Sequence, residues 1–192
     1  MKIENFWEII KTAKEAVNDN RNELSSEIEK KLKNLDNEDL LQFQLIYEQY
    51  EIIVIKSTSH LIWNALYLIN GGYCTNTYGF AGWLISNGQE VYYNAFKDSD
   101  SLVNSDSKKD NCNYEDLKYL ASNIYRERTG TKIKAYQKLL IECYKSQPFN
   151  SIIENIEKEI EFGGVRRNAN WKVDDLKEIL PKLYKKHQLE KN

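Results

Sequence analysis

The chain has 192 residues, of which 41% are hydrophobic, 12% aromatic and 29% charged, and this composition is typical of globular rather than disordered proteins. Its formal net charge of −2 gives no overall field that would favour nucleic acid or an anionic membrane. Only two prolines and eight glycines occur among many helix-forming residues, so we expect a largely helical protein.

The first half of the chain is predicted to be helical almost throughout. Apolar residues at three- and four-residue spacing predict helices over 3–17 and 22–34. Asp36 is then expected to cap a long central helix over about 36–69, because no Pro or Gly interrupts that stretch. Ser57 to Ser59 is the place for a kink, and Gly71-Gly72 is expected to end the helix.

The second half continues the helical pattern around one polar segment. Helices are predicted over 80–86 and 89–97, with a break at Asn87-Gly88. Residues 98–113 are nearly all polar and turn-forming, which predicts a polar surface loop. Further helices are predicted over 114–128, 132–145, 149–161 and 174–187, followed by a disordered tail at 188–192. These elements together predict one all-α domain over 1–192, a helical bundle of seven to eight helices around the central helix.

The cysteines and the apolar runs indicate where the protein is located and whether it binds a metal or another cofactor. Cys74, Cys112 and Cys143 are odd in number and lack CxxC spacing, which argues against a disulfide framework or a zinc site. Cys112, in the polar loop, is expected to be exposed. The N-terminal segment lacks the long apolar core of a signal peptide, and no apolar run reaches membrane-spanning length. We therefore expect a reduced, cytoplasmic protein with no membrane partner, no metal and no cofactor.

Several stretches together resemble a known bacterial family. They are FWEII, then LIWNALYLINGG followed by GFAGWLISNGQEVYYNAFKDSDSL, then LKYLASNIYRERTG, and finally NWKVDDLKEILPKLYKKH. The chain resembles the domain of unknown function 4240 family, and the segment that begins WLIS is the most specific part of the match. This resemblance implies a small, largely helical, cytosolic bacterial protein, and it supplies no established reaction.

The loop after Gly72 departs from the pattern that the resemblance implies. Relatives are expected to carry two acidic residues after a cysteine and a Phe-Arg pair before Trp-Leu-Ile. This chain instead reads Cys74-Thr75-Asn76-Thr77 and Phe80-Ala81-Gly82-Trp83. Threonine and asparagine are poor replacements for a carboxylate pair that binds a metal or moves a proton. Any acid chemistry of the family loop would therefore be missing here.

One candidate pocket can be assembled around the central helix. His60, Trp63 and Asn64 lie at i, i+3 and i+4, so they share one helix face. His60 could act there as a general base, and the full candidate set is His60, Trp63, Asn64, Cys74, Asn76 and Trp83. We favour the alternative, a half-buried histidine bonded to Asn64 or to a backbone carbonyl. Cys74 is likewise more typical of a packed thiol than of a nucleophile.

Two further sets are candidates for partner contact. In EFGGVRRNANW at 161–171, Gly163-Gly164 could free backbone amides for an anion. The side chains available to phosphate, carboxylate or a stacked ring there are Arg166, Arg167, Asn170 and Trp171. We favour instead a glycine-terminated helix followed by a solvated basic loop. Tyrosines are favoured at recognition surfaces, and four of them crowd one region as candidate protein contacts or as a rim of the core: Tyr73, Tyr78, Tyr92 and Tyr93.

Charge is distributed unevenly along the chain. Residues 1–125 hold 12 basic and 19 acidic residues, net −7, whereas residues 126–192 hold 15 and 10, net +5. We predict a protein-interaction module without catalysis, for which a toxin-neutralising immunity partner is one form. The alternative is a ligand-binding regulator or enzyme with a pocket near His60, Trp63 and Cys74. Nucleic-acid binding by the basic C-terminal third is a distant third hypothesis.

Overall fold

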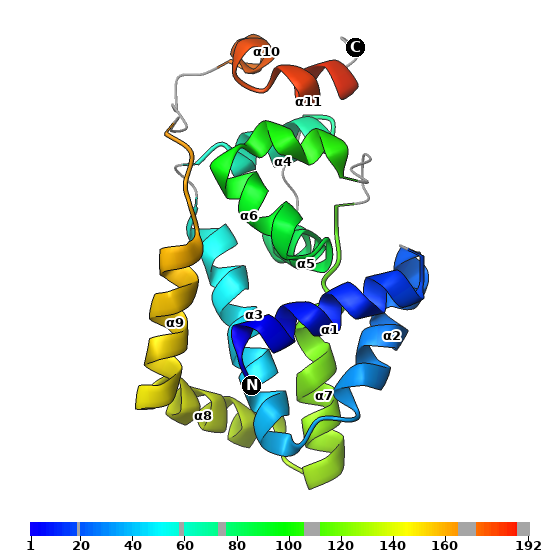
Figure 1. Cartoon of the computed structure of the whole chain (residues 1–192), viewed down its shortest axis with the longest axis vertical. Coiled ribbons are helices and arrows are strands. Elements are labelled where there is room, and N and C mark those ends of the chain that lie inside the picture. Colours follow the sequence, from blue (N-terminus) through cyan, green and yellow to red (C-terminus); the bar gives the residue numbers. More distant parts are fainter. Residues whose placement is uncertain (19, 58–59, 73–75, 106–111, 165–171, 188–192) are drawn as a thin grey trace. The chain divides into compact units, whose positions relative to one another are not determined.

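The structure, a computed structural model, describes residues 1–18, 20–57, 60–72, 76–105, 112–164 and 172–187 (Figure 1). These residues form eleven α-helices and two 3-10 helices and contain no β-strand, so the predicted all-α fold is confirmed. They divide into two compact units, Met1–Tyr50 with Asp116–Glu159, and Glu51–Glu115 with the residues from Ile160 onward. The single domain expected over 1–192 stays a prediction. None of the helices in these ranges is long and apolar enough to cross a membrane.

The first unit is built around an aromatic cluster. Its helices are α1 (Ile3–Ala16), α2 (Arg21–Leu32), most of α3 (Asn37–Lys56), α7 (Leu117–Thr129), α8 (Ile133–Tyr144) and α9 (Gln147–Glu159). The Phe6 ring of α1 lies 4.8 Å from that of Phe43 and 5.6 Å from that of Tyr50. Trp7 Nε1–H donates to Tyr50 Oη at 3.0 Å. These contacts bury large apolar rings and satisfy both polar atoms, which fixes α1 on α3.

Helix α3 is buried on nearly every side. Residues 43–47 are all buried, as expected for a helix surrounded by others. Its start is the predicted one, because Asp36 Oδ1 accepts the Asp39 N–H at 2.8 Å. The buried Gln44 amide donates to the Lys118 carbonyl at 3.1 Å, which ties the start of α7 to α3. The helix therefore organises the first unit through apolar packing and through paired polar groups.

The predicted central helix over 36–69 is two helices, α3 and α4 (Ile62–Ile69). Ser57 shows the local cause of the break. Its Oγ donates back to the Ile53 carbonyl at 2.6 Å, and its N–H bonds three residues back, to Val54, instead of four. A serine that competes in this way loosens the last turn of a helix. The break falls at the predicted kink and divides the helix completely.

The second unit contains the remaining elements. They are the end of α3, α4, α5 (Thr77–Ser86), α6 (Gln89–Lys97), η1 (Ser99–Asn104), η2 (Val173–Asp175), α10 (Leu176–Ile179) and α11 (Pro181–Lys186). The glycine stop after α4 is confirmed, since Gly71 and Gly72 have φ of 72° and 105°. Gly72 N–H donates to the Tyr67 carbonyl and Gly71 N–H to that of Leu68, the pairing of a Schellman motif. Gly88, with φ of 97°, forms the predicted break before α6.

The prediction of a polar surface loop over 98–113 is wrong for its first part. Residues Ser99–Asn104 form the 3-10 helix η1, and Ser99, Asp100 and Leu102 are buried. Asp100 can be buried because its carboxylate accepts the backbone N–H groups of Lys182 at 3.1 Å and Leu183 at 2.8 Å. These donors belong to the first turn of α11, so one acid caps a helix that is distant in sequence. Cys112 is also buried, against expectation, while residues 106–111 lie outside the described residues.

The predicted helix over 174–187 is divided into η2, α10 and α11. Proline has no N–H and disfavours helical geometry in the preceding residue, and Leu180 before Pro181 has φ of −129° and ψ of 59°. Pro181 then begins α11 at the position where proline is best tolerated. Leu176, Leu180 and Leu183 are buried, so this segment contributes to the core of the second unit. The predicted tail at 188–192 lies outside the described residues.

Removal of the Asp100 carboxylate should destabilise the second unit. Asp100→Ala leaves two backbone N–H groups of α11 without their charged acceptor. Hydrogen bonds to charged groups are worth about 1.5–3 kcal/mol, and we expect urea denaturation to show a loss of that size. Glu90→Ala removes an exposed acid from α6 and is the matched control. Equal losses in the two variants would contradict the capping role of Asp100.

The stability of the protein should depend on the protonation of His187, at the end of α11. Burial, and then the charge of Lys186, lower the pKa of His187 from its ordinary 6.5. A histidine with a lowered pKa binds protons more readily in the unfolded chain, so the free energy of unfolding falls as pH decreases through 6.5. We expect denaturation curves to show this decrease and His187→Gln to reduce it. His60→Gln is the histidine control, and an unchanged slope in His187→Gln would refute the assignment.

Candidate functional site

The two tryptophans of the predicted pocket lie in the core of the second unit. Trp83 is fully buried, and its ring stacks on Phe80 with 5.7 Å between centroids. Trp63 is 9% exposed and lies 6.3 Å from the same Phe80 ring. Both side chains thus pack around Phe80 between α4 and α5. The structure therefore gives both tryptophans a role in core packing.

His60 is half-buried, as the favoured alternative expected. Its ring lies 4.4 Å from that of Phe162, and its backbone N–H donates to the Ser57 carbonyl at 3.0 Å. Asn64 Oδ1 is buried and accepts no hydrogen bond within the described part of the chain. His60 therefore does not donate to the Asn64 oxygen, which was one of the two partners expected for it. Cys74, the proposed neighbour of His60, lies outside the described residues.

Asn76 holds the start of α5 in place. Its Oδ1 accepts the Gly79 N–H at 3.0 Å, and its Nδ2 donates to Asn113 Oδ1 at 3.3 Å and to Glu115 Oε2 at 3.2 Å. Tyr114 N–H in turn donates to the Gly79 carbonyl at 2.8 Å. A side chain at Gly79 would overlap that of Asn113, so the close approach of these segments needs glycine there. Asn76 is thus a helix cap whose amide is engaged on both sides.

The other two predicted sets are only partly described. The Gly163 N–H, which the less favoured anion hypothesis would leave free, donates to the Phe96 carbonyl at the end of α6 at 2.9 Å. Arg166, Arg167, Asn170 and Trp171 lie outside the described residues, as does Tyr73.

The remaining tyrosines do not form one exposed set. The assignment of Tyr92 as a protein contact is wrong, because its ring is fully buried 5.1 Å from that of Phe96. Tyr93 is half-buried, with its ring 5.8 Å from that of Tyr92. Tyr78, at 47% exposure, is the described member of the set that is well exposed.

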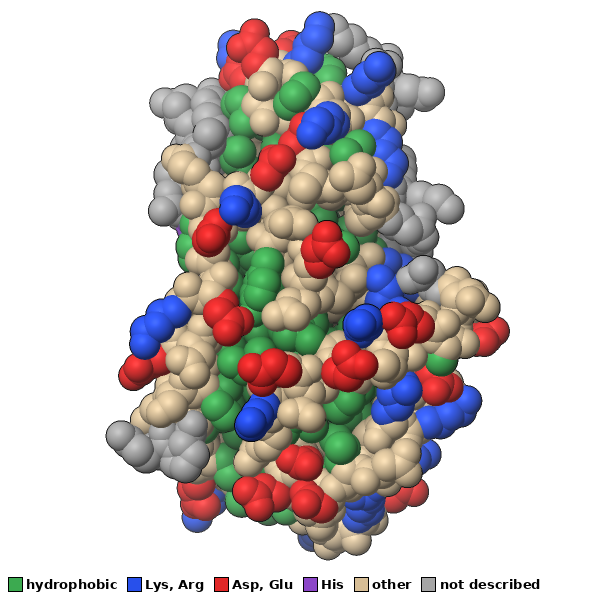
Figure 2. Space-filling view, viewed as in Figure 1, with side chains coloured by type: hydrophobic (Ala, Val, Ile, Leu, Met, Phe, Trp, Pro, Cys, Tyr) green, Lys and Arg blue, Asp and Glu red, His purple; other side chains and the backbone are tan. Residues whose placement is uncertain are grey.

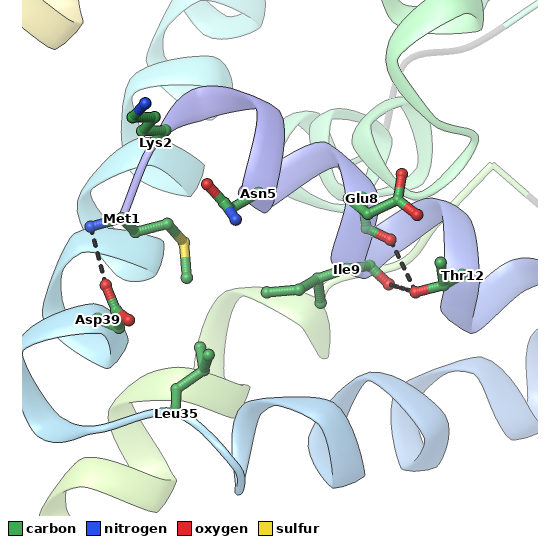
Figure 3. Close-up of a pocket in the computed structure, with 8 residues that line it drawn as sticks. All are labelled: Met1, Lys2, Asn5, Glu8, Ile9, Thr12, Leu35 and Asp39. Carbon is green, nitrogen blue, oxygen red and sulfur yellow. Dashed lines mark hydrogen bonds and ion pairs between the residues drawn. The ribbon is translucent and has the colours of Figure 1, made fainter.

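A cavity of about 530 Å³ lies in the first unit beside the first half of α1 (Figure 3). In the figure the side chains of Met1, Ile9 and Leu35 extend toward its middle. The amine of Met1 pairs with Asp39 at 2.8 Å, and Thr12 Oγ1 donates to the Glu8 carbonyl at 2.8 Å. Its size suits a small ligand, but several of its polar groups are already engaged within the chain. The cavity is a weaker candidate than the surface around α8.

A smaller groove is lined mainly by α3 and α9, and Cys143 near the end of α8 also lines it. Its volume is about 170 Å³, and it is lined by Glu38, Leu41, Gln42, Leu45, Cys143, Ser146, Phe149 and Ile152. Gln42 Nε2 donates to Glu38 at 3.2 Å, whereas the buried Gln42 Oε1 accepts no hydrogen bond from the described residues. The groove thus joins an apolar lining to an unused acceptor. A partner side chain that carries a donor could satisfy it.

Cys143 faces this groove without the character of a nucleophile. Burial, followed by the charges of Glu142 and Glu38, raises the pKa of the Cys143 thiol. A raised pKa keeps the sulfur protonated at neutral pH, and the thiolate is the reactive form. The thiol therefore serves the packing of the groove. Among the described residues, no group of three His, Cys, Asp or Glu side chains is placed to hold a metal ion.

Exposed apolar side chains gather on α8. Six large hydrophobic residues are well exposed in the described ranges, namely Tyr78, Tyr119, Ile133, Ile141, Tyr144 and Phe162. Ile133, Ile141 and Tyr144, which we call the α8 strip, all belong to one helix. The strip was not predicted from the sequence, although apolar residues on more than one side of 133–144 were a usable signal. Figure 2 shows acidic and basic side chains interspersed on the visible face, with hydrophobic atoms exposed between them.

Comparison with known proteins identifies a family. A family model described as "Protein of unknown function (DUF4240)" matches residues 1–127. The match covers more than half of the chain, so the chain belongs to this family. No curated protein and no solved structure matches it. Helices α8 to α11 follow the matched residues, so the strip lies in the part of the chain that the family model does not cover.

Loss of the Asn76 amide should weaken the start of α5. Replacement of an N-cap by alanine costs about 0.5–2 kcal/mol, and Asn76→Ala also removes the bonds to Asn113 and Glu115. We expect a loss near the upper end of this range in urea denaturation. Asn94→Ala, at an exposed position of α6, is the matched control. Stability equal to that of the control would show that Asn76 is not a structural cap.

Proposed function

We propose that this protein is a protein-interaction module that acts without catalysis. The observation that carries the proposal is the α8 strip, in which Ile133 is 47%, Ile141 55% and Tyr144 39% exposed. Exposed apolar side chains scattered singly are ordinary, but three on one face of one helix favour a contact surface. The groove that Cys143 and Phe149 help to line adds an apolar depression near the end of α8.

The proposal extends to the setting in which the protein works. We place it in the bacterial cytoplasm and consider an immunity role, in which it binds and neutralises a toxin, as one form of the interaction. The uneven charge supports a protein partner, because residues 126–192 carry net +5 while the whole chain is close to neutral. The alternative pocket near His60 draws less support, since Trp63 and Trp83 serve the core.

A single exposed side chain should discriminate this surface from others. Ile141→Ser removes the most exposed member of the strip and should change stability by no more than about 0.5 kcal/mol. If Ile141 is an anchor of the interface, its loss should lower the affinity for a captured partner by about tenfold or more. The measurement is affinity capture from cells of the source organism, followed by calorimetry with the purified partner.

Tyr78→Ser is the matched control, because Tyr78 is 47% exposed and lies on α5, in the second unit. Partner affinity that is unchanged by Ile141→Ser would refute a role for the α8 strip. If Tyr78→Ser lowers the partner affinity instead, the interface lies on the surface predicted from the tyrosines.

A further inference from the structure

The exposed apolar residues of α8 lie on one flank of the helix, on which the polar Gln137 separates Ile133 from Ile141. At about 100° per residue, Ile133, Gln137, Ile141 and Tyr144 fall within an arc of about 80° on the helix surface. At a rise of about 1.5 Å per residue, the flank is about 16 Å long, or three turns. An arc of this width and length matches the apolar face of one partner helix better than a broad, flat surface.

This flank is held in a fixed orientation from inside the first unit. Tyr136 and Leu140, which are buried, form the inner face of α8. Tyr144 Oη donates to Gln49 Oε1 at 3.3 Å, and its ring lies 5.5 Å from that of Phe149. The helix therefore presents the strip without a rearrangement. A rigid, preorganised surface loses less conformational entropy on binding.

Lysines border the strip on its solvent side. Lys134, Lys138 and Lys145 follow the apolar arc at about 100–140° on the same helical wheel, and all three are exposed. Residues 132–145 contain four lysines and one acid, Glu142, so this segment carries a net charge of +3. Glu142 lies 4.0 Å from Lys138, with both side chains exposed, so that pair is weak. The border is therefore basic along its whole length.

We propose that the α8 strip docks an acidic amphipathic helix of a partner protein. Apolar side chains of that helix at i, i+3 or i+4, and i+7 cover Ile133, Ile141 and Tyr144. Its carboxylates lie against Lys134, Lys138 and Lys145. Charge complementarity selects this occupant, because acidic groups beside an apolar seam match both the strip and its border. The inference rests on the proposed function and adds the chemistry of the partner.

The same charges disfavour two other occupants. A second copy that presented the same flank would bring lysines of both copies together, and like charges across an interface are repulsive. An anionic membrane would be attracted to the lysines, but it would also meet Glu142, and on this flank of α8 it would find three exposed apolar side chains to insert. Both occupants are outcomes that the experiment can detect.

The experiment uses two synthetic amphipathic peptides about five turns long, with leucines on one face and either Glu or Lys on the other. Calorimetry with the full chain should show binding of the Glu peptide that weakens as salt is raised. Ile141→Ser should weaken it about tenfold. Lys134→Glu combined with Lys145→Glu should weaken it by at least as much and should create affinity for the Lys peptide. Lys158→Glu, on α9, is the control for a change of charge elsewhere on the first unit and should have no effect.

Three results would overturn the proposal. They are equal binding of both peptides by the wild type, self-association that light scattering shows to be lost in Ile141→Ser, and binding to phosphatidylglycerol vesicles that depends on Ile141. The double lysine variant also separates this inference from the proposed function. If Ile141→Ser no longer binds a captured partner but the double variant still does, the partner does not use an acidic helix, while the α8 strip remains the interaction surface. If both variants still bind the partner, the α8 strip is not the interaction surface.

Discussion

Gln49 attaches α8 and α9 to α3 through the two ends of one side-chain amide. Its Oε1 accepts the hydroxyl of Tyr144 on α8, and its Nε2 donates to Glu157 on α9, each at 3.3 Å. Gln49 is 3% exposed, and an amide left unsatisfied at such a position costs about 1–3 kcal/mol. Both helices must therefore be in place for the buried Gln49 amide of α3 to make its hydrogen bonds. The arrangement of the first unit depends on this polar link as well as on apolar packing.

The same link decides which side of α8 faces solvent. Tyr136 and Leu140 lie inside, and the Tyr144 hydroxyl reaches Gln49 while 39% of the residue stays exposed. The Tyr136 hydroxyl makes no hydrogen bond within the described residues, and burial raises its pKa, so it remains a neutral phenol packed 5.2 Å from the Tyr125 ring. The buried Tyr136 and Leu140 and the hydrogen bond of Tyr144 together hold α8 in an orientation that leaves Ile141 exposed. The exposed strip is a consequence of how the helix is anchored.

Local signals in the sequence identified most helices, and long-range partners account for what they missed. Helix α6 was predicted with its observed bounds, because Gly88 before it gives a clear local stop signal. The burial of Asp100 could not be foreseen, since the N–H groups that satisfy it lie more than 80 residues away. Tyr92 was a candidate either for protein contact or for the rim of the core, and only the fold shows that it packs against Phe96. The α8 strip was missed because the pattern that predicts a helix does not say which of its apolar faces will find a partner within the chain.

The residues beyond the family match have two physical roles. Leu176, Leu180 and Leu183 are buried in the second unit, and Asp100, inside the match, caps the helix that carries Leu183. Polar groups and apolar surface of the matched residues 1–127 are therefore paired and covered by the helices that follow the match. Helix α8 is also among these later helices, and it is bound to matched residues through Gln49. The outward side chains of such a helix can change without loss of the inward contacts that hold the scaffold.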